Sequence, residues 1–174
     1  MIDVRRSPPA PLLAIMGVSG SGKTTLGAAL SQRLGLPFAD ADDFHSSANL
    51  AKMSAGTPLD DTDRLPWLCT IGDWLAAHSA TGCVLSCSAL KRSYRDLLRA
   101  SAPALSFVHL NPPPPVVHRR MAGRLGHFMP ASLVDSQFQA LEPLRPDEPG
   151  ITLDLDLPVD QLVTACLVTP TPGE

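Results

Sequence analysis

The sequence predicts a three-layer α/β fold, in which a mostly parallel sheet of five strands carries helices on both faces. Short apolar runs of strand type alternate along the chain with longer segments of helical periodicity, a pattern typical of strand–helix–strand units. The glycine-rich stretch GVSGSGKTT directly follows the first apolar run, LLAIM, and precedes a helical segment. With 174 residues, the chain is long enough for one domain with a full core and too short for two.

The N-terminal half is expected to contain two strands and three helices. Residues 12–17 predict a buried strand that enters the glycine-rich loop. Residues 24–35 have leucines at helical spacing and end on a glycine, which favours a helix end. Residues 36–40 predict a short second strand that leads into the acidic cluster DADDFH. Helices are then expected over residues 47–55 and 64–80, separated by the turn GTPLDD.

The C-terminal half is expected to contain three strands and four helices. Residues 83–90 predict the third strand, ahead of a basic helix over residues 91–102, and residues 105–110 predict the fourth strand. The stretch NPPPP is expected to end regular structure, because proline donates no backbone hydrogen bond. The remaining expected elements are a helix over residues 116–125, a loop over 126–132, a helix over 132–144, a strand over 151–157 and a helix over 158–168 that begins at Pro158.

The composition argues against several classes of protein. Apolar residues make up 44% and charged residues 18% of the chain, as in ordinary globular proteins. The net charge is −3 and no block of lysine and arginine occurs, so we expect no nucleic-acid partner. No apolar run approaches the roughly 20 residues that span a bilayer, so we expect no membrane partner and a cytoplasmic location. Four cysteines without a C-x-x-C pair are expected to be reduced, buried thiols: Cys69, Cys83, Cys87 and Cys166.

The glycine-rich stretch fits the pattern G-x-x-x-x-G-K-[ST] and has the expected strand before it and helix after it. Its glycines let backbone N–H groups converge, and the following helix offers its positive N-terminus, so the loop is suited to bind phosphates. Lys23 is expected to reach the β- and γ-phosphates, and the Thr24 hydroxyl to ligate Mg²⁺. The sequence therefore predicts a nucleotide-binding P-loop. The nucleotide-binding residues are expected to be Gly17, Val18, Ser19, Gly20, Ser21, Gly22, Lys23, Thr24 and Thr25.

Acidic residues follow the predicted second strand, where a parallel sheet exposes its carboxyl edge beside the phosphates. Asp40 is expected to hold Mg²⁺, directly or through water. Asp42 is expected to accept the proton of the acceptor's hydroxyl group or to orient that group. The alternative for these residues is helix capping, which we expect chiefly for Asp43. A guanine-reading N-K-x-D motif is absent from the sequence, so a small-molecule kinase fits better than a GTPase.

Four segments of the sequence resemble the P-loop gluconokinases, and the first of them, residues 40–68, contains two motifs. DADDFHSSANLAKM and GTPLDDTDRLPWL, within residues 40–68, are similar to the family's G-D-x-x-H-x-x-x-N-x-x-K-M and G-x-P-L-x-D-x-D-R-x-P-W-L. CSALKRSYRDLLR (residues 87–99), RMAGRLGHF (residues 120–128) and SQFQALEP (residues 136–143) resemble three further family motifs. The resemblance covers residues 12–168. It implies an adenylate- or shikimate-kinase-like fold with a lid, and transfer of phosphate from ATP, with Mg²⁺, to D-gluconate.

The domain organisation follows from the same resemblance. The kinase domain is expected over residues 12–168, with an acceptor-binding segment at 42–80 and a lid at 120–135. Segments 1–11 and 169–174 are expected to be disordered. Homodimers are frequent in the family, so a homodimer is expected here. Trp67 and Trp74 lie on one helical face and are expected to serve core packing or a subunit interface.

Gluconate carries a carboxylate and several hydroxyl groups, so its site needs a cation and polar partners. Arg64, His45 and Lys91 are the candidates, and Arg64 suits best because a guanidinium binds a carboxylate with two parallel hydrogen bonds. The alternatives are a surface ion pair of Arg64 with Asp60 or Asp61, a solvated helix start for Lys91, and a polar helix entry for His45.

The resemblance also assigns roles near the nucleotide. Arg120 is expected against the adenine, Arg124 over the phosphates as a catalytic residue beside Lys23 and Asp42, and His127 in the lid as a substrate ligand. Pro158 is expected under the adenine. The alternative for both arginines is a solvated helix face. Two other functions stay open: a kinase for another small acceptor such as shikimate, whose G-G-G motif is replaced by CSALK here, and a non-enzymatic P-loop switch.

Overall fold

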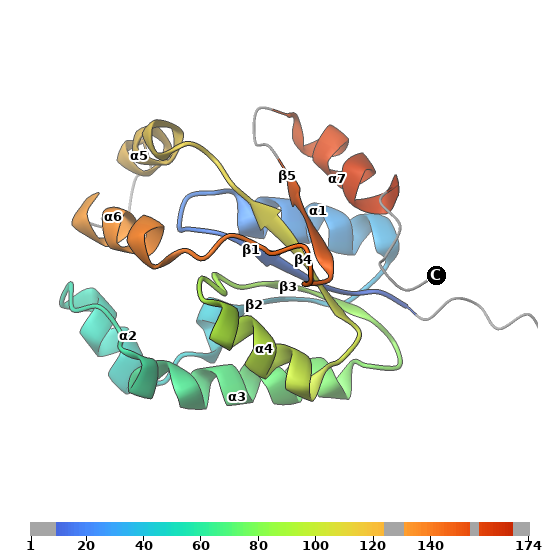
Figure 1. Ribbon diagram of the computed structural model, residues 1–174, viewed down its shortest axis with the longest axis horizontal. Helices are drawn as coiled ribbons and strands as arrows, with labels where there is room; N and C mark the ends of the chain where they lie inside the picture. The colour runs from blue at the N-terminus through green and yellow to red at the C-terminus, as the bar shows by residue number, and fades with distance from the viewer. Residues whose placement is uncertain (1–9, 124–130, 154–156, 169–174) are drawn as a thin grey trace, which may run out of the picture.

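The computed structural model describes residues 10–123, 131–153 and 157–168. Its centre is a five-stranded sheet with the strand order β2-β3-β1-β4-β5, and each pair of neighbouring strands is parallel (Figure 1). In the registers, Leu12 pairs with Cys83 on one side and with Leu105 on the other. The strands are β1 (Leu12–Met16), β2 (Phe38–Asp40), β3 (Cys83–Ser86), β4 (Leu105–Leu110) and β5 (Gly150–Leu153).

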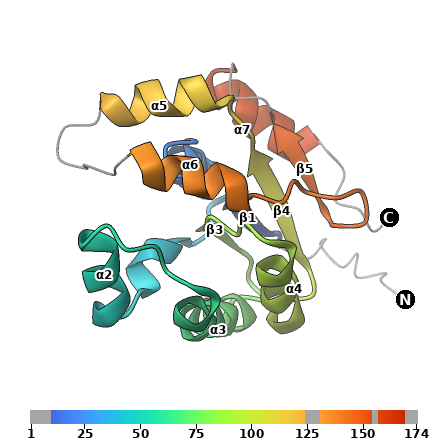
Figure 2. The same ribbon diagram turned by 60° about the vertical axis from the view of Figure 1, so that its left-hand side comes forward.

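Helices cover both faces of the sheet, so the three-layer fold is confirmed. One layer holds α1 (Lys23–Leu34) and α7 (Val159–Val168), and the opposite layer holds α3 (Asp61–Ala77) and α4 (Arg92–Ser101) (Figures 1 and 2). The other helices gather around the carboxyl edge of the sheet. They are the 3₁₀ turn η1 (Ala41–Phe44), α2 (Ser47–Ser54), α5 (Pro114–Ala122) and α6 (Ala131–Ala140).

The hydrophobic core has one part on each face of the sheet, because successive side chains of a strand point to opposite faces. Ile15 and Val108 pack with the leucines of α1 and with α7. Leu85 and Phe107 point the other way and pack with α3 and α4. A third, smaller cluster around Val117 lies between the glycine-rich loop, α5 and α6. Packed helices and loops therefore surround the carboxyl edge of the sheet on several sides.

Helices α3 and α5 begin two or more residues earlier than expected. Helix α3 begins at Asp61, inside the predicted turn, because Asp60 and Asp63 form a reciprocal capping box there. Helix α5 begins at Pro114, inside the NPPPP stretch that was expected to end regular structure. Proline is tolerated in the first helical turn, where its missing N–H would have no helical partner.

Strand β3 and helix α6 each end four residues before their predicted ends. Strand β3 ends at Ser86, and residues 87–90 turn away from the sheet with Ala89 at a positive φ of 42°. Helix α6 ends at Ala140 instead of residue 144. The cysteines are free, as expected, and Cys83 and Cys87 are buried, but Cys69 is exposed on α3, which corrects its predicted burial. Within the described residues, no helix is both long and apolar enough to cross a bilayer.

Candidate active site

The glycine-rich loop wraps around the N-terminus of α1, where three glycines have conformations that side chains disfavour. Gly17, Gly20 and Gly22 have φ values of 140°, 78° and 100°. A Cβ on Gly17 would lie 2.5 Å from the Leu110 carbonyl oxygen. Helix α1 has no side-chain cap and no acidic residue in its first turn, so its N–H groups and positive end face the loop. This geometry suits a polyanion.

The Lys23 ammonium lies over the same loop. Lys23 Nζ donates to the Val18 carbonyl oxygen at 3.0 Å, and Val18 itself is buried. The loop also contacts α6: the Ser19 N–H donates to Gln137 Oε1 at 2.7 Å. Gln137 has no role among the sequence-based predictions, although it belongs to the SQF motif. A chain separation of 118 residues hides such a contact from sequence patterns.

Three oxygen-bearing side chains meet where α1, β2 and β3 converge. Thr24 Oγ1 donates to Asp40 Oδ2 at 2.8 Å and lies 3.5 Å from Ser86 Oγ. Asp40 Oδ1 accepts the Asp42 N–H at 3.1 Å, so Asp40 caps η1, and the predicted cap Asp43 does not. Hydroxyl and carboxylate oxygens are the ligands that Mg²⁺ prefers. Ser86 was missed, although a serine ending an apolar strand at the carboxyl edge is a usable signal.

Asp42 lies beside this group on η1. Its side chain is 87% exposed, yet the protein atoms around it and the negative charge of Asp40 raise its pKa, an effect that Lys23 and His45 partly offset. One side of the carboxyl group is therefore exposed to solvent, and the other side faces protein atoms. A raised pKa makes its carboxylate a better proton acceptor.

His45 is held by aromatic stacking. Its ring lies 4.5 Å from the Trp67 ring, at an interplanar angle of 10°. Trp67 is buried, as expected for a core residue, and its Nε1 donates to the Ala41 carbonyl oxygen at 2.7 Å, which fixes η1 to α3. Burial lowers the pKa of His45, the Asp42 carboxylate raises it and the Arg64 cation lowers it. The neutral imidazole is therefore favoured.

Arg64 and Lys91 both lie close to the Tyr94 ring. Arg64 Nη1 donates to the Tyr94 hydroxyl at 3.4 Å, and its guanidinium carbon lies 5.8 Å from the ring centroid. Arg64 forms no ion pair with Asp60 or Asp61, which was the alternative. Lys91 Nζ instead pairs with Asp61 at 2.8 Å, and Tyr94 also donates to Asp61.

Asp61 therefore forms one hydrogen-bonded group with Lys91 and Tyr94. The hydrogen bonds from Lys91 and Tyr94 hold the pKa of the Asp61 carboxyl below its usual value. Neither Tyr94 nor Asp61 was among the predicted substrate residues. Each belongs to a quoted motif, but only the fold places residues 61 and 94 against each other.

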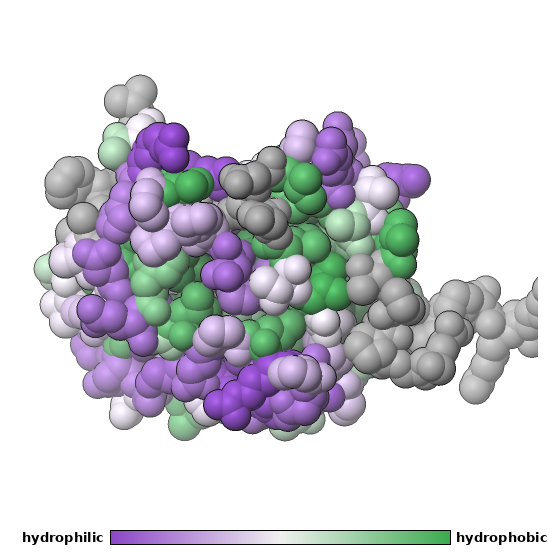
Figure 3. Space-filling view, turned by 45° about the horizontal axis from the view of Figure 1, so that its top comes forward, coloured by the Kyte–Doolittle hydropathy of each residue, from purple (hydrophilic) through white to green (hydrophobic). Residues whose placement is uncertain are grey.

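A cavity of about 330 Å³ lies between the glycine-rich loop, α5 and α7. Arg120 lines it, and Arg120 Nη1 donates a hydrogen bond to the Ser21 carbonyl oxygen at 3.5 Å. Thr25, Leu157 and Val159 also line it, whereas Pro158, which lies between the last two in the chain, is not among the lining residues. Figure 3 shows apolar residues gathered on this face between polar margins. The volume and the apolar lining suit a planar heteroaromatic ring.

Two predicted residues cannot be placed against this geometry. Arg124 and His127 lie outside the described residues, as do residues 124–130 of the predicted lid in general. The two helices that flank residues 124–130 are described, and they contact each other: His118 Nε2 on α5 lies 2.9 Å from Asp135 Oδ1 on α6.

Comparisons with known proteins agree with this arrangement. A family model described as shikimate kinase matches residues 19–132, well over half of the chain. The chain is 49% identical over 141 residues to a gluconokinase of Gluconobacter oxydans (strain 621H), with 80% of this chain and 79% of that protein covered. It is 42% identical over 156 residues to the thermosensitive gluconokinase of Escherichia coli (strain K12), with 87% and 83% covered.

A solved structure gives the same result in three dimensions. The crystal structure of a gluconokinase from Sinorhizobium meliloti 1021 superposes with a TM-score of 0.84 at 46% identity, covering 93% of this chain and 91% of that one. The similarity therefore extends over the sheet, the glycine-rich loop and the acceptor-side helices together.

Proposed function

The chain belongs to the gluconokinase family of P-loop kinases, and from that premise we propose that it transfers the γ-phosphoryl group of ATP to D-gluconate, forming 6-phospho-D-gluconate. The observation that carries the proposal is the position of Asp40. Its two oxygens contact the P-loop residue Thr24 and the backbone of the acceptor-side residue Asp42. One carboxylate thus joins the phosphate-binding and acceptor-binding halves of the site.

The P-loop is proposed to bind the triphosphate. Its backbone N–H groups and the Lys23 ammonium would neutralise charge on the β- and γ-phosphates, which is most of what phosphoryl transfer asks of a protein. Thr24 and Asp40 would hold Mg²⁺, and the neighbouring Ser86 hydroxyl supports that site. When bound, Mg²⁺ would supply positive charge that neutralises the negative charge on the phosphates during transfer.

Asp42 is proposed to receive the acceptor's hydroxyl group. Its exposed carboxylate is free to accept a hydrogen bond, and its raised pKa favours proton acceptance. Because the transition state of phosphoryl transfer is loose, Asp42 would act more by orienting the hydroxyl than by full deprotonation.

Arg64, His45 and Lys91 are proposed to bind gluconate. The Arg64 fork would hold the carboxylate, and His45 and Lys91 would bind hydroxyl groups. Because Lys91 is paired with Asp61 and a neutral imidazole is favoured at His45, the site offers both donors and acceptors. An analogue without these hydroxyl groups would leave polar groups of the site unpaired, so it should be rejected strongly.

The nucleotide base is proposed to occupy the cavity beside Arg120, close to Pro158, whose chain neighbours Leu157 and Val159 line it. Arg124 is proposed to reach the transferring phosphoryl group, and His127 to contact the acceptor. Closure of residues 120–135 would exclude water and suppress ATP hydrolysis. The contact between His118 and Asp135 supports a common movement of the two helices that flank residues 124–130.

The proposed setting is a cytoplasmic homodimer. Leu50 on α2 and Leu65 on α3 are about half exposed, and burial of these side chains in a subunit contact would remove apolar surface from water. Sedimentation equilibrium at several protein concentrations tests the dimer, and a single species at the monomer mass contradicts it.

A coupled assay of ADP release tests the proposed reaction. The acceptors are gluconate, other sugar acids, shikimate and nucleosides, each with ATP and Mg²⁺. We expect turnover with gluconate and little with the others. ADP release with shikimate and none with gluconate would favour the alternative small-acceptor kinase.

A further inference from the structure

Residues 87–91 form the loop between β3 and α4 and have no regular structure. This loop positions Lys91, one of the proposed gluconate ligands. Ala89 has a positive φ of 42°, and Lys91 is the N-cap residue of α4. The Lys91 side chain makes no capping hydrogen bond, and the first turn of α4 has no acidic residue. The positive end of this helix therefore needs a partner from elsewhere in the chain.

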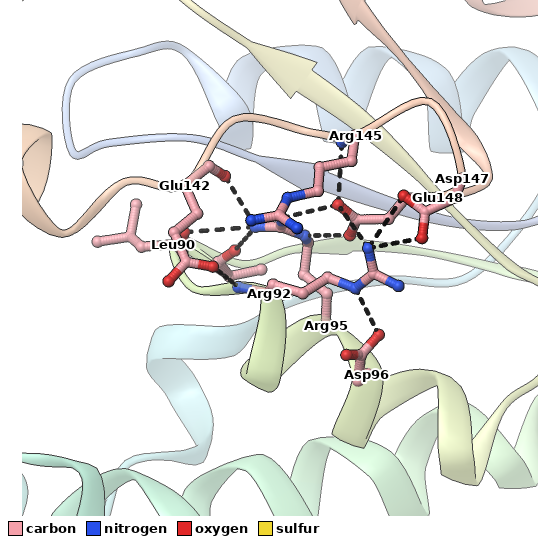
Figure 4. A network of polar contacts seen from close by, with 9 residues as sticks. Leu90, Arg92, Arg95, Asp96, Glu142, Arg145, Asp147 and Glu148 are labelled. Atoms are coloured by element: carbon pink, nitrogen blue, oxygen red, sulfur yellow. Dashed lines mark hydrogen bonds and ion pairs between the residues drawn. The ribbon is translucent and has the colours of Figure 1, made fainter.

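Glu142, just beyond α6, supplies that partner through both its side chain and its backbone. Glu142 Oε2 accepts the Arg92 N–H at 2.8 Å, at the first residue of α4. The Glu142 N–H donates to the Leu90 carbonyl oxygen at 2.8 Å. The Glu142 carbonyl oxygen accepts from Arg95 Nη1 at 3.1 Å. Figure 4 shows these contacts converging on the start of α4.

Arg95 locks the other side of the same loop. Its side chain is fully buried, and Arg95 Nη1 also donates to the carbonyl oxygens of Ala89 at 3.1 Å and Leu90 at 3.3 Å. Its remaining nitrogens form a bidentate ion pair with Glu148 at 2.5 and 2.9 Å. The backbone at Glu142 is thus anchored independently of its carboxylate, so a change in that side chain removes the helix cap alone.

The segment that carries Glu142 also contacts the phosphate loop. Gln137, five residues earlier on α6, accepts the Ser19 N–H at 2.7 Å. We propose that Glu142 is a positioning residue, whose carboxylate caps α4 and holds Lys91 in a fixed place relative to the phosphate loop. The proposal rests on the proposed function, because Lys91 matters as a ligand of the acceptor.

Steady-state kinetics of Glu142→Ala and Glu142→Gln test the proposal. Glu142→Ala should raise KM for gluconate by about fivefold, the size of a lost helix cap, with KM for ATP and kcat within about twofold of the wild type. Glu142→Gln keeps an oxygen acceptor and should restore most of the affinity. Asp96→Asn removes another carboxylate near Arg92, on the exposed face, and should leave KM unchanged.

Amide hydrogen exchange over residues 89–94, measured without nucleotide or acceptor, provides a second readout. Exchange should be faster in Glu142→Ala and near wild-type in Glu142→Gln. Unchanged exchange in Glu142→Ala, or an equal rise in KM for gluconate and ATP, overturns the proposal. A wild-type enzyme without gluconate turnover overturns the substrate assignment instead, and the exchange measurement still decides whether the cap exists.

Discussion

At the scale of single residues, the site combines groups that share contacts. Asp40 contacts Thr24 through one oxygen and the Asp42 backbone through the other, so the proposed metal binding and the proposed acceptor orientation both depend on one side chain. On the acceptor side, Tyr94 contacts both Arg64 and Asp61. For variants of these residues, KM should therefore be measured separately for ATP and for gluconate, together with kcat.

Asp42→Asn should lower kcat by about 100-fold or more, because a neutral amide oxygen orients the hydroxyl group through a weaker hydrogen bond than a carboxylate and cannot accept its proton. The affinity for ATP should stay near the wild-type value, since Asp42 touches the metal-binding group only through its backbone N–H. Single-turnover rates and nucleotide titrations measure the two effects separately. A large loss of ATP affinity would place Asp42 on the metal instead.

Arg64→Ala should raise KM for gluconate by about 10- to 100-fold, the range expected for loss of a charged hydrogen-bonding partner. Arg64→Lys keeps the charge without the two-pronged geometry and should recover only part of the affinity. KM for ATP should change little. A comparable rise in both Michaelis constants would contradict a specific contact with the gluconate carboxylate.

At the scale of elements, helix caps and buried ion pairs decide where the acceptor-side segments begin and how they are held. The capping box of Asp60 and Asp63 starts α3 early enough to include Asp61, which pairs with Lys91. Lys52 of α2 pairs with Asp63 at 2.6 Å, which ties α2 to the same helix start.

Asp60→Ala should lower the free energy of unfolding by about 1 kcal/mol, because the N-cap acceptor for the Asp63 N–H is lost. Asp60→Asn retains a side-chain oxygen and serves as the matched control, with a smaller loss. Urea denaturation measures both variants. Equal losses in the two variants would mean that the charge of Asp60, and not the capping hydrogen bond, stabilises the helix start.

The buried pair of Arg95 and Glu148 joins α4 to the segment that leads into β5. Burial alone would raise the pKa of Glu148, but hydrogen bonds from Arg95 and the Arg145 N–H outweigh it and lower that pKa. Arg95→Met should therefore cost about 3–5 kcal/mol of unfolding free energy, since it leaves a buried carboxylate unpaired.

The double variant Arg95→Met, Glu148→Leu distinguishes the loss of the ion pair from the cost of leaving one buried charge unpaired. It removes both charges and should be more stable than Arg95→Met alone. Denaturant unfolding of the single and double variants makes the comparison. A double variant less stable than Arg95→Met would show that Glu148 contributes through contacts other than the ion pair.

At the scale of the whole molecule, one buried histidine should make folding stability depend on pH. His109 lies in β4 with 1% of its surface exposed, and neither ring nitrogen has a hydrogen-bond partner among the described residues. Burial, with a contribution from the Arg95 cation, lowers the pKa of His109 to about 4, against the opposing charge of Glu148.

A histidine in the unfolded chain takes up a proton near pH 6.5, whereas the buried His109 does so only near pH 4. Protonation of His109 therefore does not lower the free energy of unfolding above about pH 6.5. The free energy of unfolding decreases progressively as the pH falls from about 6.5 to about 4, by up to about 3 kcal/mol. His109→Phe should abolish this part of the pH dependence. Unfolding free energies at pH 7.5, 6, 5 and 4 measure it, and equal slopes in both proteins would contradict the assignment.

Sequence patterns alone predicted the fold and the phosphate loop. Strand runs such as Leu12–Met16 and the glycines of GVSGSGKTT act through local geometry, since periodicity and permitted φ values depend on neighbours along the chain. Boundaries failed where side chains decide them, as at the capping box of α3, or where proline fits a first helical turn, as at Pro114.

Tertiary structure decided which distant residues meet. The contacts of Thr24 with Ser86, Ser19 with Gln137 and Arg92 with Glu142 join positions 50 to 118 residues apart. No local pattern encodes such pairs, because they arise only when parallel strands end at one edge and helices pack around it. The sequence by itself therefore determined the class of chemistry, and the packed fold determined which side chains share the site.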